Sequence, residues 1–304
     1  MSYDPREAEG VTGMDELELA STFERHRPQL RAVAYRILGS LTEADDAVQE
    51  GWLRLSRTDA RQIDSLEPWL TTVVARICLN MLRSRRTRGE QPLDGFLPEP
   101  IIDDPAVGTH PEREALLADA VGIALQVVPD TLRPAERLAF VLHDMFAVSF
   151  EEIAAMVDRS PQATRQLASR ARRRVREAAP PPDPDMTRQR AVVDAYFAAA
   201  REGDLEALVA VLDPDVVLRA HRRDGDPGEL HGAARVAKGA MGARRFAPYV
   251  RPALVNGTAG AIAFDGERPF AVLAFTVVGD RAVAIDVFNY PGLVGKLDIR
   301  GITA

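Results

Sequence analysis

One stretch decides the fold of the middle of this chain: residues 150–176 read FEEIAAMVDRSPQATRQLASRARRRVR. Ser149 precedes the stretch and Glu152 follows three residues later, which is the capping-box pattern of a helix start. Ser160 with Pro161 marks a second start, because proline is tolerated at the first position of a helix. The sequence therefore predicts a short helix, a tight turn and a longer helix, with a shared apolar seam formed by Ile153, Ala154, Val157, Leu167 and Ala171.

The longer helix carries polar side chains on the face away from that seam. Arginine, glutamine and serine can hydrogen-bond base edges or phosphates in a major groove. The pattern indicates a helix-turn-helix that binds DNA, although a solvated basic helix in an ordinary bundle is the alternative. The outward residues are Gln162, Arg165, Gln166, Ser169, Arg170 and Arg173.

The N-terminal segment is predicted to be helical. Apolar residues recur at helical spacing up to Leu38, and Gly39-Ser40 ends that helix. Thr42 is expected to cap a second helix, with Asp45 and Asp46 in its first turn near the positive end of the helix dipole. A third helix is expected over 66–86.

Proline and glycine residues divide the rest of the chain into linkers and regular elements. They predict irregular linkers over 90–112 and 179–186, with helices over 114–128 and 134–145 between them. The last part has two helical patterns, 187–201 and 205–211, and then strand patterns over 216–220, 249–256, 259–265, 270–278 and 282–288. The expected organisation is a disordered 1–14, all-α domains over 15–89 and 113–178, and an α+β domain with an antiparallel sheet over 187–304.

Composition narrows the functional classes. The net charge of −7 does not exclude nucleic acid, because binding depends on local charge, and the arginines cluster in the predicted helices. Cys78 is the single cysteine and is expected to be a buried core thiol. The sequence has no export signal, membrane span, metal-ligand spacing or cofactor motif, so we expect a cytoplasmic protein without metal or cofactor.

Residues 41–55, LTEADDAVQEGWLRL, closely resemble the helix of sigma region 2 that docks on RNA polymerase. Residues 68–86 resemble the region 2 helix that meets the −10 element, and residues 129–176 resemble region 4, which reads the −35 element. The resemblance is to extracytoplasmic-function sigma factors. It implies a non-enzymatic protein whose partners are core RNA polymerase and promoter DNA, with the helix-turn-helix as the −35 reader.

The resemblance also implies site residues. Core polymerase would contact Asp45, Asp46, Gln49, Glu50 and Trp52. The −10 element would meet Arg76, Asn80, Arg83, Arg85 and Arg86, with an unpaired base held by the loop around 57–65. The connector of such factors threads a polymerase channel that later holds RNA, and its carboxylates, including Asp103 and Asp104, would mimic RNA charge; a solvated spacer is the alternative.

Residues 190–217 resemble the opening of SnoaL-like, cone-shaped α+β barrels, and one sigma subgroup carries such a domain after region 4. That subgroup has a linker motif matched here by Phe96, Leu97, Pro98, Glu99 and Pro100, and a glycine-rich motif that survives only in part as Asp224, Gly225 and Gly228. We expect this domain to regulate the protein. Any small-molecule ligand or anti-sigma partner stays open.

Two alternatives also stay open. One is a helix-turn-helix regulator that acts without polymerase, and the other is a DNA-binding protein whose SnoaL-like domain is an isomerase or cyclase. Conceivable pocket residues for that chemistry are His221, Asp224, His231 and Asp286, but no matched acid–base pair is evident, so we expect no catalytic residues.

Overall fold

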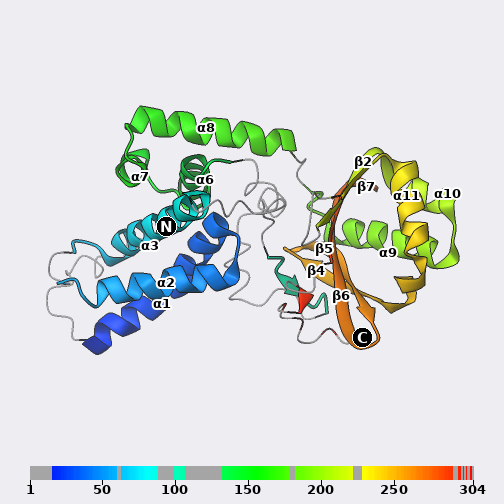
Figure 1. Cartoon of the computed structure of the whole chain (residues 1–304), viewed down its shortest axis with the longest axis horizontal. Coiled ribbons are helices and arrows are strands. Elements are labelled where there is room, and N and C mark those ends of the chain that lie inside the picture. Colours follow the sequence, from blue (N-terminus) through cyan, green and yellow to red (C-terminus); the bar gives the residue numbers. More distant parts are fainter. Residues whose placement is uncertain are drawn as a thin grey trace. The chain divides into compact units, whose positions relative to one another are not determined.

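The computed structural model describes residues 16–59, 63–87, 99–106, 132–178, 182–221 and 228–289, with positions 294, 295, 297, 299 and 302. The chain divides into two compact units (Figure 1). The helical unit combines residues 1–90 with 131–174, and the sheet unit combines 91–130 with 175–304. The predicted helix over 114–128, the disorder expected for 1–14, and Phe96, Leu97, Pro98, Asp224 and Gly225 lie outside the described residues.

Three helices begin the helical unit: α1 Glu16–Leu38, α2 Leu41–Leu55 and α3 Leu66–Thr87. Gly39 ends α1 with a φ of 74°, a conformation that glycine adopts without steric cost. The prediction that Thr42 caps α2 is wrong. Ser40 is the cap, and its hydroxyl accepts from the Glu43 amide, so Glu43 occupies the first turn and Asp45 and Asp46 begin the second.

Helices α2 and α3 cross closely at Gly51. A Cβ atom there would lie 3.0 Å from Cγ2 of Val74, so a larger residue would push the helices apart. Val48, Leu70, Val74 and Cys78 are buried around this crossing, which confirms the core position expected for the cysteine.

The second part of the helical unit contains α6 Pro134–Phe140, a π turn Val141–Met145, α7 Phe150–Val157 and α8 Pro161–Ala178. Ser149 and Glu152 form the predicted capping box, and the Ser160 hydroxyl accepts from the Ala163 amide. The π turn interrupts the single helix predicted over 134–145. The apolar seam also differs, because Thr164 and Ala168 are buried whereas Leu167 is only half-buried.

The sheet unit begins with α9 Met186–Glu202 and α10 Leu205–Ala210, which are capped by Asp185 and Asp204. Helix α11 Ala233–Gly242 and a 3-10 turn Arg244–Tyr249 follow later and were not predicted. These helices lie against one face of a curved sheet (Figure 1).

Among the described residues, seven strands form the sheet in the order β1-β4-β5-β6-β7-β2-β3. Their bounds are β1 Ile102–Asp103, β2 Leu212–His221, β3 Gly228–His231, β4 Val250–Val255, β5 Thr258–Asp265, β6 Arg268–Val278 and β7 Arg281–Phe288. The five predicted strands are present, so the α+β class is confirmed. The sequence analysis did not predict strand β3. It predicted an antiparallel sheet, whereas β2 pairs with β7 in parallel. It also predicted an irregular linker, whereas residues 102–103 form β1 despite the prolines nearby.

Apolar residues fill both faces of the sheet. On β6, Leu273, Phe275 and Val277 face the core under the helices, where Phe275 packs against Tyr196 and Phe197. The alternate residues of the strand, such as Val272, belong to a second cluster on the opposite face, which includes Ile102 of the linker strand. The sheet is therefore covered on one side by helices and on the other by the linker strand and C-terminal residues.

Gly260 sits where strand β5 has no room for a side chain. A Cβ atom there would lie 2.5 Å from Val255 Cγ2 and 2.6 Å from the Leu273 carbonyl oxygen. Gly260→Ala should therefore destabilise the sheet unit by about 1–3 kcal/mol through overpacking. Both tryptophans, Trp52 and Trp69, lie in the helical unit. Circular dichroism should show a lowered melting transition that tryptophan fluorescence does not. Gly242→Ala, which meets no atom within 4 Å, is the control and should lower neither transition.

Candidate functional site

Helix α8 has one buried face and one exposed polar face. Thr164, Ala168 and Ala171 are buried against the rest of the unit. Every outward residue predicted from the sequence is exposed: Gln162, Arg165, Gln166, Ser169, Arg170 and Arg173. The helix therefore presents a continuous row of hydrogen-bond donors that a major groove can receive.

Acidic side chains orient some of the α8 arginines. Arg172 donates to Asp144 at 2.6 Å, and Arg174 donates at 2.8 Å to the buried Glu136. Arg165 donates to Glu151 at 3.1 Å and lies over the Phe150 ring. Arg172 and Arg174 are thus held by ion pairs within the helical unit, whereas other arginines of α8 lie on its exposed face. The sequence of consecutive arginines does not by itself distinguish these two groups.

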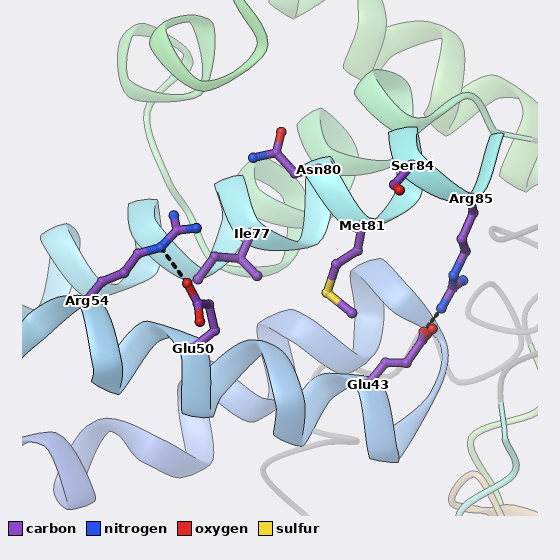
Figure 2. Close-up of a pocket in the computed structure, with 8 residues that line it drawn as sticks. All are labelled: Glu43, Glu50, Arg54, Ile77, Asn80, Met81, Ser84 and Arg85. Atoms are coloured by element: carbon purple, nitrogen blue, oxygen red, sulfur yellow. Dashed lines mark hydrogen bonds and ion pairs between the residues drawn. The ribbon is translucent and has the colours of Figure 1, made fainter. Parts of the chain in front are cut away.

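Helix α3 carries a second exposed polar stripe. Arg76, Asn80 and Arg83 are spaced four and three residues apart, which places them on one face, and all three are exposed. Arg85 differs: it is half-buried and forms an ion pair with Glu43 of α2 (Figure 2). The backbone of Arg86 lies in α3, but its side chain is outside the described residues.

A groove of about 390 Å³ runs between α2 and α3. Figure 2 shows the Glu50–Arg54 ion pair at one end and the Glu43–Arg85 ion pair at the other, with Met81 directed into the space between them. The residues expected to contact polymerase and those expected to contact DNA therefore meet along one groove. Its lining consists of Glu43, Glu50, Arg54, Ile77, Asn80, Met81, Ser84 and Arg85.

The residues of α2 that were predicted to contact polymerase also differ in exposure and in pairing. Asp45, Asp46 and Gln49 are exposed, but Asp45 is engaged by Arg31 at 2.6 Å. Trp52 is half-buried and packs against the ring of Phe23, with centroids 5.1 Å apart.

Sequence reasoning missed Leu53, which is 38% exposed on the face that carries Asp46 and Gln49. Its position, seven residues after Asp46, is the signal that could have indicated it.

The linker strand is held to the sheet by Asn256. The backbone N–H of Ile101 donates to the side-chain oxygen Oδ1 of Asn256 at 2.8 Å. In return, the backbone N–H of Asn256 donates to the carbonyl oxygen of Ile101 at 2.8 Å. Asn256 is buried with a φ of 52°, a left-handed conformation that asparagine tolerates better than most residues. Pro100 beside this strand is buried and Glu99 is half-buried, whereas Gly228 begins β3 in open space.

Of the conceivable catalytic residues of the sheet unit, the structure brings His221 and Asp286 together, whereas His231 pairs elsewhere and Asp224 lies outside the described residues. His221 Nε2 lies 3.0 Å from Asp286 Oδ1, with Arg219 nearby, and these residues lie on the sheet face opposite the helices. His231 instead pairs with the exposed Glu229.

The part of the chain that the structure describes contains no group of three metal-ligating side chains and no helix long and apolar enough to cross a membrane.

Comparisons with known proteins agree with this geometry. The family models for Sigma-70 region 2 and Sigma-70, region 4 match residues 22–88 and 124–175. The Mycobacterium tuberculosis ECF RNA polymerase sigma factor SigJ is 38% identical, covering 91% of this chain and 93% of that protein. The probable sigma factor SigI of the same species is 31% identical over 92% and 96%.

A crystal structure of the Mycobacterium tuberculosis SigJ protein matches with a TM-score of 0.74 and 33% identity, covering 92% of this chain and all of that one. The similarity therefore extends through the sheet unit as well as the helices. Membership of the family also agrees with the prediction that the chain is not an enzyme. The chain belongs to the extracytoplasmic-function RNA polymerase sigma factors.

Proposed function

We propose that this sigma factor binds core RNA polymerase through the exposed face of α2 and reads the −10 and −35 promoter elements with α3 and α8. The observation that carries the proposal is that each of the three helices has several of the expected polar residues exposed on one face: Asp46 and Gln49 on α2, Arg76, Asn80 and Arg83 on α3, and the six outward residues of α8. In vitro transcription tests it: core polymerase with this protein should give a promoter-specific transcript. Promoter binding without any such transcript would indicate instead a regulator that acts without polymerase.

On α2, Asp46 is the acid best placed to meet polymerase. It is exposed, and among the described residues no cation forms an ion pair with it, whereas Asp45 is bound to Arg31. Asp46→Arg should weaken core binding by about tenfold or more, since reversing an interfacial charge replaces attraction by repulsion.

Fluorescence anisotropy with labelled protein measures this affinity. Glu202→Arg makes the same charge change in the sheet unit and should leave core affinity unchanged. Equal affinities for the two variants would remove Asp46 from the interface.

On α8, Arg170 and Arg172 provide a matched pair. Arg170 lies on the exposed face, whereas Arg172 braces Asp144 within the unit. Arg170→Ala should weaken binding to −35 DNA and reduce the salt slope by about 0.9, the value for one lost phosphate contact. Arg172→Ala should leave the slope unchanged. Titrations across a series of salt concentrations measure both, and identical slopes for Arg170→Ala and wild type would contradict the assignment.

The sheet unit, which resembles a SnoaL-like domain, is proposed to modulate activity by holding the linker. The linker residues held in this way include Asp103 of β1, which lies opposite Leu254 of β4 in the strand register. A linker bound as an edge strand is not free to extend through the polymerase channel that the family resemblance implies. Capture should therefore restrain initiation, and release should increase it.

Asn256→Gly tests this capture, because glycine keeps the left-handed backbone but removes the side-chain acceptor. Hydrogen exchange of residues 99–106 should accelerate by about fivefold, as expected for one lost hydrogen bond, and transcription should rise. Asn256→Asp retains Oδ1 as the acceptor, so its exchange should be slower than that of Asn256→Gly even though the carboxylate is buried. Faster exchange without any change in transcription would rule out the regulatory role.

A further inference from the structure

The π turn Val141–Met145 is an irregular element of the helical unit, and π turns of this kind are frequent at functional sites. Two of its side chains contact the helix-turn-helix. Asp144 accepts a hydrogen bond from Arg172 of α8 at 2.6 Å, and the His143 ring stacks on the Phe150 ring of α7 with centroids 3.7 Å apart. The π turn is therefore attached to both helices of the DNA-binding motif.

The backbone that follows the π turn holds His143 in place. Nδ1 of His143 donates at 3.0 Å to the carbonyl oxygen of Val148, whose own N–H donates at 3.0 Å to the carbonyl oxygen of Leu142. Ala147 has a φ of 53°, a left-handed conformation that is uncommon for residues other than glycine and that allows this tight return of the chain. His143 is half-buried among these contacts, so Phe150 packs on a well-defined surface.

The Phe150 ring also contacts Arg165 of α8. The guanidinium of Arg165 lies over this ring at 5.5 Å from its centre, which is within the range of a cation–π interaction. Nη2 of Arg165 donates at 3.1 Å to Oε1 of Glu151, the next residue of α7. An exposed arginine without such contacts samples many rotamers, and a ring together with a carboxylate reduces their number. Phe150 and Glu151 therefore set the orientation of the Arg165 guanidinium.

The surroundings of Arg165 favour contact with a base edge over contact with a phosphate. Arg165 lies in the first turns of α8, which begins at Pro161, and the N-terminal residues of a recognition helix are those that contact bases. The Glu151 carboxylate offsets the charge of Arg165 and would repel a phosphate brought to the same place. Other N–H donors of the guanidinium remain for guanine O6 and N7, the acceptors that arginine contacts most often in a major groove.

We propose that His143 and Phe150 form a platform that positions Arg165 to read a guanine of the −35 element. This proposal rests on the proposed sigma function and deepens it, because it makes His143 and Phe150 positioning residues for base recognition. The role of Arg165 then differs from that of Arg170, which is proposed to contact a phosphate. Loss of the platform should reduce discrimination between bases while leaving the general attraction to DNA unchanged.

A base analogue tests the guanine contact in the complex of the full-length protein with core polymerase. Each guanine in the −35 region of a transcribed promoter is replaced in turn by 7-deazaguanine, which lacks the N7 acceptor. At one position the replacement should weaken wild-type binding by about tenfold, as expected for a lost hydrogen bond from a charged group. Arg165→Ala should be insensitive to that replacement and should keep the wild-type salt slope, because no phosphate contact is lost.

Two substitutions of Phe150 test the platform. The quantity compared is the affinity ratio, which is the affinity for guanine DNA divided by the affinity for 7-deazaguanine DNA. Phe150→Leu keeps an apolar side chain but removes the ring face, so the affinity ratio should fall by about two- to fivefold. Phe150→Tyr keeps the ring and should retain the wild-type ratio. A partly unfolded preparation lowers both affinities equally, so it leaves the affinity ratio unchanged.

His143→Ala tests the other ring of the stack. It should lower the affinity ratio in the same direction, and combining it with Phe150→Leu should lower the ratio no further, since both residues act through one stack. Tyr249→Leu removes an exposed ring of the sheet unit and is the control. It should have the wild-type affinity ratio.

Equal affinity ratios for wild type, Phe150→Leu and Phe150→Tyr would overturn the platform. A wild-type complex in which no guanine of the −35 region responds to the replacement would overturn the guanine contact. In both cases the promoter-specific transcript would still be made. Absence of that transcript from the wild-type protein would instead count against the sigma function itself, so the failures are distinguishable.

Discussion

The arrangement depends on how helix α3 is divided between a buried and an exposed face. Leu70, Val74 and Cys78 are buried against its neighbours, and Val74 lies against Gly51 where α2 and α3 cross closely. With that face buried, residues three and four apart on the other side must point outward together. The exposure of Arg76, Asn80 and Arg83 is thus a consequence of core packing.

The distribution of basic side chains on the surface of this protein depends on which arginines form ion pairs, and not on the net charge of the whole chain. Acids such as Glu136 and Asp144 hold individual arginines of α8 against the unit, while other arginines of the same helix remain on the surface. Exposed ion pairs contribute little to the free energy of unfolding. A buried carboxylate such as Glu136 would be costly without a cation beside it, so its ion pair with Arg174 is strongly favoured. Local pairing explains how a chain of net charge −7 can still present basic faces to nucleic acid.

In the sheet unit, the edge of β4 would carry unpaired backbone groups if β1 did not pair with it. An open edge invites pairing with another strand, and here the linker supplies that strand. Ile102 also covers apolar residues on the sheet face that the helices leave open. The described linker residues are therefore structurally part of the sheet unit.

Local sequence signals determined most of the elements: periodicity located the helices other than α11, the Ser149–Glu152 box and Ser160 fixed the starts of α7 and α8, and strand patterns located five strands. Helical spacing also identified the exposed face of α8. Only the tertiary structure decided that Arg85 pairs with Glu43, that Arg172 is a brace, that the proline-rich linker forms a strand, and that β2 runs parallel to β7. These features depend on partners far away in the chain, and local propensity carries no record of which distant group a side chain or strand edge will meet.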